Sequence, residues 1–196
     1  MSYGKDSGGI GRPLLVDTEG RSITKPGGGK YADAALNGRL FCCATQTAIN
    51  MSTTLNTTFV GWGLTNPTGS GKLIIVHEFA YAVTAQVTNE TLLALATTTD
   101  SGMTVAEFAP RCCRNGYATS VATVRDGGTI VAPVIERVIG QIVSGADTVS
   151  YGGMVPNIVD LGGSIVLAPG RCLVTDSTVA PGAVMQFSYL WEEVDA

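Results

Sequence analysis

The sequence has few charged side chains, which limits what the protein can bind. Charged residues are 14% of the 196 residues and hydrophobic residues are 45%, whereas an average soluble protein is roughly 25% charged. The net charge is −4, and nucleic-acid binding normally needs clustered Lys and Arg on one face. We therefore expect no nucleic-acid partner and a surface made largely of Thr, Ser, Asn and Gly.

Long apolar runs are also missing, and this bears on contact with membranes. No stretch reaches the roughly 18 apolar residues that a transmembrane helix needs. The first residues, Met1 to Asp6, lack the apolar region of a signal peptide. We expect no membrane partner, and synthesis in a cytoplasm without secretion by that route.

Histidine occurs once, at His77, so a Ser/His/Asp or Cys/His catalytic unit would have to be built on it. His77 alternates in phase with Ile75 and Phe79, which predicts that it faces the core or an interface. The acids Glu192 and Glu193 have the composition of a general acid/base site, but near the chain end they indicate a solvated terminus. We expect no catalytic residues and no enzyme activity.

Cysteine is present in an odd number, as Cys42-Cys43, Cys112-Cys113 and Cys172. Adjacent cysteines rarely bridge each other, and the CxxC or HxxxH spacings that preorganise zinc ligands are missing. The pattern favours buried, reduced cysteines on or beside strands. A metal site built from Cys42, Cys112 and His77 is the alternative. We expect no metal and no other cofactor.

A glycine-rich loop ending in lysine, GSGK at residues 69–72, invites comparison with a phosphate-binding loop. Asn66 stands where that motif needs its first glycine, and Leu73 replaces the required Ser or Thr. A strand pattern follows the loop, whereas phosphate is held at the N-terminus of a helix. The segment therefore predicts a hairpin-like turn and no nucleotide site.

Glycine is concentrated at the start of the sequence, where eight of the 25 glycines fall in the first 30 residues. The segment KPGGGK at 25–30 is flexible and breaks helices. We therefore divide the chain into an extended arm and linker, 1–38, and a folded domain, 39–196. An apolar triplet in the arm predicts a short strand that either docks on its own domain or crosses onto a neighbouring subunit. In the second case the contacting residues are Arg12, Leu14, Leu15, Val16 and Ile23.

From residue 39 onward, strand patterns alternate with turns. Residues 72–83 are too rich in β-branched and aromatic residues for an exposed helix. Their period of two places one set of side chains on a single face: Leu73, Ile75, His77, Phe79, Tyr81 and Val83. Residues 185–191 alternate in the same way. Other strands are expected at 39–48, 57–64, 117–124, 129–139, 163–168 and 171–175, which together indicate an all-β sandwich or barrel.

Two further segments and two tryptophans complete the pattern. Residues 89–99 are the only stretch that favours a helix of two or three turns, and the Gly and Pro residues of 97–160 suggest long loops or an insertion. Trp62 and Trp191 lie inside strand patterns. Tryptophan is common both in cores and at interfaces, so we expect these two in the core or in a seam between subunits, with a carbohydrate platform as the alternative for Trp191.

Three stretches resemble a group of small virion proteins of tailed bacteriophages. They are GWGLTNPTGSGKLII at 61–75, IVLAPG at 165–170 and FSYLWEEV at 187–194. The resemblance implies a jelly-roll-like antiparallel β-sandwich that forms trimers on the capsid or elsewhere on the particle, with no catalytic residues to carry over. A scarcity of charge and an extended arm suit a subunit that is covered by copies of itself.

The resulting hypothesis is a decoration, or cement, protein on the capsid surface of a virion, made in the host cytoplasm. Its partners would be its own copies and the major capsid protein, with the arms adding avidity by multivalent binding. The alternative is a receptor-binding or tail-tip module of the same fold, in which loops near 100–116 and 145–160 bind a host glycan. A cupin-like enzyme would need several histidines for its metal, which this sequence does not have.

Overall fold

The computed structural model describes residues 3–5, 11–13, 29–51, 58–83, 89, 91–99, 107–142, 157–180 and 184–196. The chain divides into two units, Met1–Asp33 and Ala34–Ala196. In the first unit, β1 (Tyr3–Lys5) and β2 (Gly11–Pro13) form an antiparallel pair. Within the described residues, no helix is long and apolar enough to span a membrane.

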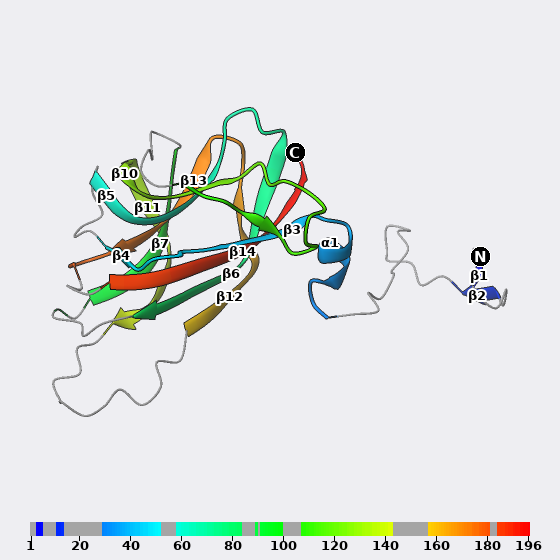
Figure 1. The fold of residues 1–196 in the computed structure, drawn as a ribbon, viewed down its shortest axis with the longest axis horizontal. Coiled ribbons are helices and arrows are strands. Elements are labelled where there is room, and N and C mark those ends of the chain that lie inside the picture. Colours follow the sequence, from blue (N-terminus) through cyan, green and yellow to red (C-terminus); the bar gives the residue numbers. More distant parts are fainter. Residues whose placement is uncertain are drawn as a thin grey trace, which may run out of the picture. The chain divides into compact units, whose positions relative to one another are not determined.

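The second unit is a sandwich of two six-stranded antiparallel sheets (Figure 1). One, the β7 sheet, has the order β11-β7-β13-β5-β10-β8, and the other, the β6 sheet, has the order β12-β6-β14-β3-β9 with β4 beside β14. The bounds are β3 Leu40–Ala44, β4 Ile49–Asn50, β5 Thr58–Asn66, β6 Lys72–Val83, β7 Thr91–Thr99, β8 Glu107–Phe108, β9 Arg111–Cys112, β10 Thr123–Thr129, β11 Val131–Ile142, β12 Asn157–Leu167, β13 Arg171–Ser177 and β14 Val184–Asp195.

Eight of these strands are nested as in a jelly roll. In chain order they are β3, β5, β6, β7, β11, β12, β13 and β14, and the first pairs with the last, the second with the seventh, the third with the sixth and the fourth with the fifth. This nesting is the double Greek key of a jelly roll. The predicted fold class is confirmed by this antiparallel sandwich. The strand expected at 117–124 is wrong for most of its length, because 117–122 are turn and irregular backbone and β10 begins only at Thr123.

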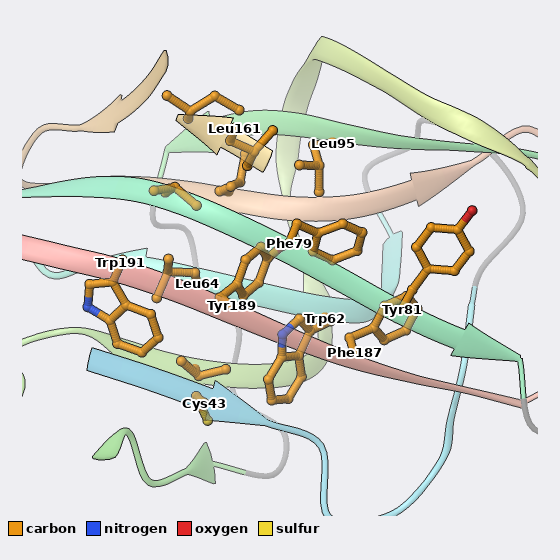
Figure 2. Close-up of a cluster of buried hydrophobic side chains, with 14 of the residues drawn as sticks. Cys43, Trp62, Leu64, Phe79, Tyr81, Leu95, Leu161, Phe187, Tyr189 and Trp191 are labelled. Atoms are coloured by element: carbon orange, nitrogen blue, oxygen red, sulfur yellow. The ribbon is translucent and has the colours of Figure 1, made fainter. Parts of the chain in front are cut away.

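The core lies between the two sheets and is rich in aromatic side chains (Figure 2). Trp62 of β5 stacks on Tyr189 of β14, with ring centroids 6.3 Å apart. Phe79 of β6 packs against Tyr189 and Phe187 at 5.3 and 5.9 Å. Burying each large apolar side chain stabilises the fold by roughly 1.5–3 kcal/mol, so this cluster joins the sheets strongly.

One short helix, α1 (Ala32–Leu36), precedes the sandwich. It ends in a Schellman motif, in which the N–H groups of Gly38 and Arg39 donate to the carbonyls of Ala35 and Ala34. Gly38 has φ +69°, a left-handed conformation that favours glycine. Ala34 and Gly38 are buried, so the sandwich unit begins inside the segment predicted as arm and linker.

The segment predicted to be helical, 89–99, is instead strand β7 (Thr91–Thr99). It pairs with β11 on one side and β13 on the other, so two ladders of hydrogen bonds override its helix propensity. Leu93 and Leu95 point into the core, while Ala94 and Ala96 face the other side of the sheet. The region 97–160, predicted to form long loops or an insertion, contributes β8, β10 and β11 to the β7 sheet and β9 to the β6 sheet.

Strand β6 has the predicted bounds, but its inward face changes half-way along. Ile74 and Val76 are buried in its first half, and Phe79 and Tyr81 in its second. The change occurs because consecutive residues Leu190 and Trp191 of β14 pair with Glu78 and Val76, leaving His77 as the extra residue of a β-bulge. The prediction that Ile75 and His77 share the inward face of Phe79 is therefore wrong.

Candidate interaction surface

Strand β11 forms one edge of the β7 sheet and exposes an unusual number of apolar side chains. Val134 and Val138 are 64% and 58% exposed, and Val131 and Ile135 are exposed as well. Pro133 lacks an N–H group and fits an edge position. A long, apolar, exposed edge strand normally favours association with another chain.

Irregular pairing explains why so many β11 side chains are exposed. The register against β7 shifts at three places, between Val131 and Val134, between Ile135 and Arg137, and between Val138 and Gly140. Bulges twist a strand and interrupt its alternation, and they also hinder continuous pairing with another strand. A partner on this edge would therefore pack on side chains more than extend the sheet.

The second sheet has a similar edge beside the first. Strand β12 is at the edge of the β6 sheet, and its Ile158 and Val166 are exposed. An open pocket of about 220 Å³ is lined by Glu136 of β11 and by Ser164 to Leu167 of β12, so the two edges meet there. We call the exposed apolar residues of both edges the edge surface: Val131, Val134, Ile135, Val138, Ile158 and Val166.

A buried carboxylate lies next to the edge surface. Asp176 of β13 is only 5% exposed, and it helps to line a small pocket whose other walls include Leu92, Ile135 and Val138. The N–H group of Ser177 donates to Asp176 Oδ1 at 2.7 Å. Burial raises the pKa of Asp176 to about 6 despite this hydrogen bond, because an apolar environment disfavours the charged form.

This raised pKa predicts that stability changes with pH. Because Asp176 has a higher pKa in the folded chain than in the unfolded chain, its charge destabilises the fold above about pH 6. We expect Asp176→Asn to raise the free energy of unfolding at pH 7.5 by roughly 1–3 kcal/mol. At pH 4 the difference between variant and wild type should shrink, since wild-type Asp176 is then protonated in the folded state.

Urea unfolding at the two pH values measures this effect. Asp195→Asn is a suitable control, because Asp195 is exposed and pairs with Lys72 Nζ at 2.6 Å, which lowers its pKa. A loss of stability in Asp176→Asn at pH 7.5 would contradict the prediction.

Of the residues predicted to contact a neighbouring subunit, the structure describes the side chains of Trp62 and Trp191. Trp62 and Trp191 are both 0% exposed within the chain, so they serve the core and offer no surface to a partner. Arg12 is part of strand β2, and its side chain is not among the described parts. Leu14, Leu15, Val16 and Ile23 lie outside the described residues.

The acids near the chain end have partners, which corrects the prediction of a solvated terminus. Glu193 is 5% exposed and accepts hydrogen bonds from Trp191 Nε1 and from the N–H of Val121, each at 3.1 Å, and from Ser120 Oγ. Glu192 pairs with Arg39 Nε at 3.0 Å and lies 3.5 Å from His77 Nε2. These carboxylates hold strand β14 to its surroundings.

The cysteines do not gather into a metal site. Within the described residues, no group of three or more His, Cys, Asp or Glu side chains is placed to hold a metal ion. Cys43 points into the core, and Cys172 is buried, where it accepts a hydrogen bond from Thr65 Oγ1 at 3.1 Å. Cys112 packs against the core and Cys42 lies on the other side of β3, which separates two ligands of the alternative site.

The glycine-rich loop at 67–71 is a turn between β5 and β6, as predicted. Asn66 is 0% exposed, and its Nδ2 donates to the carbonyls of Lys72 and Leu167, both at 2.8 Å. Its backbone carbonyl accepts the N–H of Gly170. Asn66 thus connects residues 61–75 to residues 165–170 by hydrogen bonds, and this role is structural.

No family model, curated protein or solved structure matches this chain. The edge surface therefore has to be interpreted from its own residues. The sequence pattern predicts a strand at 129–139 but does not identify it as an exposed edge. Two signals were present: Pro133, which is disfavoured in a central strand, and apolar residues on both sides of the charged pair Glu136-Arg137.

Proposed function

We propose that this protein is a non-catalytic structural subunit that associates with its own copies through the edge surface. The observation that carries the proposal is the exposure of Val131, Val134, Ile135 and Val138 along one bulged edge strand. An exposed, apolar edge strand favours association with another chain. Association of identical chains usually gives a closed, symmetric oligomer, and a trimer is the state that the resemblance implies.

We further propose that the oligomer decorates and stabilises the capsid of a tailed bacteriophage. The support is the resemblance of 61–75, 165–170 and 187–194 to small virion proteins, together with the jelly-roll nesting of the strands. In this proposal the arm, 1–38, bridges neighbouring subunits or capsomers. Several weakly binding arms on one oligomer would give strong avidity.

The self-association predicts a specific effect of charge on β11. In the double variant Val134→Asp, Val138→Asp, we expect the dissociation constant of the oligomer to rise at least tenfold, because each buried contact would then enclose an unpaired carboxylate. Both side chains are exposed in the single chain, so the fold should persist. Sedimentation velocity over a range of concentrations measures the change, and circular dichroism checks the fold.

Leu36→Asp provides a matched control, since Leu36 is 68% exposed on α1 and outside the edge surface. An oligomer unaffected by the double variant would show that the edge surface is not the contact, and a monomeric wild type would reject self-association.

The position on the particle is tested separately, by electron microscopy with a labelled protein. Label over the whole head supports decoration, whereas label at a single vertex supports the tail module.

A further inference from the structure

Two cysteines distant in the sequence lie side by side on one surface of the β6 sheet. Strands β3 and β9 pair so that Phe41 is opposite Cys112 and Cys42 is opposite Arg111. The N–H of Cys113 continues this pairing by donating to the carbonyl of Leu40 at 2.9 Å. Since side chains alternate along a strand, Cys42 and Cys113 share the side that faces away from the core.

The pair is close together and open to small molecules. Cys42 is near enough to add to the effect of burial in raising the pKa of the Cys113 thiol. Cys42 lines an open groove of about 290 Å³ over β3, β6 and β14, and Cys113 is exposed. By contrast, Cys43 and Cys172 are buried, where an oxidant has little access.

We propose that Cys42 and Cys113 form a reversible disulfide when the protein meets an oxidising medium. The oxidant is a low-molecular-weight disulfide such as oxidised glutathione. The Cys42 thiolate attacks one of its sulfurs, releasing one reduced glutathione and leaving a mixed disulfide on Cys42. The Cys113 thiolate then attacks the Cys42 sulfur and releases the second glutathione, so the two protein thiols lose two protons and two electrons.

The order of the two steps follows from the surroundings of Cys113. Partial burial, and then the neighbouring Cys42, raise the pKa of Cys113 to about 12. Cys113 is therefore a protonated thiol at neutral pH, and it suits the second, intramolecular attack, where its proximity compensates for the small thiolate fraction. We expect closure of the bond to be faster at pH 9 than at pH 7 by up to about a hundredfold, because the thiolate fraction of such a group rises about tenfold per pH unit.

The bond would connect the segment after β9 to strand β3, which lie far apart in the sequence. A cross-link over about 70 residues restricts the unfolded chain, and its predicted effect is a rise in melting temperature on the order of 10 °C. Such a bond suits a protein made in a reducing cytoplasm and later exposed outside the cell. The chemistry itself does not depend on the proposed function.

The test uses the purified full chain, incubated with oxidised glutathione at pH 8, then unfolded in urea and alkylated with N-ethylmaleimide. Mass spectrometry of peptides without reduction should show Cys42 linked to Cys113, with three thiols still alkylated, and the melting temperature should rise and return after reduction. Cys113→Ser and Cys42→Ser should abolish both effects. Cys172→Ser should keep them, because Cys172 is buried in the other sheet.

Three outcomes would overturn the proposal. The first is complete alkylation of both cysteines after prolonged oxidation. The second is a stable mixed disulfide on one of them without closure. The third is a link between two chains, which would show that the thiols of one chain do not reach each other.

Discussion

Glu193→Ala is expected to lower the free energy of unfolding by roughly 3–5 kcal/mol, because it leaves several buried donors without an acceptor. The carboxylate accepts from Ser120 Oγ, from the N–H groups of Val121 and Ala122, and from Trp191 Nε1. It is 5% exposed, so water cannot easily replace it. A domain of this kind has a total stability of about 5–15 kcal/mol, so the loss is a large share.

The adjacent acid supplies the matched control. Glu192 faces the other side of β14 and forms an ion pair with Arg39, whose side chain is 43% exposed. Partly exposed pairs contribute about 0–1 kcal/mol, so Glu192→Ala should have a much smaller effect. Urea unfolding of both variants measures the difference. Equal losses would contradict the inference that hydrogen bonds to Glu193, and not merely negative charge on β14, stabilise the end of the sandwich.

Glu193→Gln refines the same experiment. The amide keeps one acceptor oxygen but places a donor where the second carboxylate oxygen accepts the N–H of Val121. We expect Glu193→Gln to lower the free energy of unfolding, but by less than Glu193→Ala does. A Gln variant as stable as wild type would show that the second oxygen contributes little.

Gly38→Ala is expected to lower the free energy of unfolding by about 2–4 kcal/mol. The structure shows two separate causes. The first is the left-handed conformation, since Gly38 has φ +69° and other residues adopt it at a cost of roughly 1–2 kcal/mol. The second is steric: a Cβ at this position would lie 2.0 Å from Cδ1 of Tyr117. The Tyr117 ring is held by the guanidinium of Arg114, 3.9 Å from the ring centroid.

A double-mutant cycle with Tyr117→Ala distinguishes the two sources. If the clash is important, the double variant should be more stable than the sum of the single losses predicts, by about 1 kcal/mol or more. If the losses add, the backbone conformation accounts for the whole effect. Gly116→Ala is a useful comparison, because Gly116 has φ +72° but open space around its Cβ position.

Much of the strand pattern could be predicted, because alternation and turn residues act locally. Strand β6 has the predicted bounds, and the aromatic residues Phe187, Tyr189 and Trp191 of β14 point into the core as expected. The turn after Asn66 was also predicted from its Pro and Gly residues. These features depend on side-chain type and on neighbours a few residues away.

The incorrect predictions share a cause, which is that the structure there depends on residues distant in the sequence. Strand β7 has a sequence that favours a helix, and only its pairing with β11 and β13 makes it a strand. The outward position of His77 depends on a bulge set by the register with β14. A shift of one residue moves every later side chain to the other face, and no property of residues 72–83 alone indicates where that shift occurs.

Composition and periodicity are enough to predict an all-β chain with few charges, a single histidine and an aromatic core, because they act on each residue independently of its distant partners. The tertiary structure determines which strands are edges, and therefore which apolar residues are exposed: Trp62 and Trp191 are in the core, while Val134 and Val138 are on the surface. It also buried Asp176 and Glu193 and brought Cys42 beside Cys113. Those contacts join residues far apart in the chain, and only the order and register of the strands establish them.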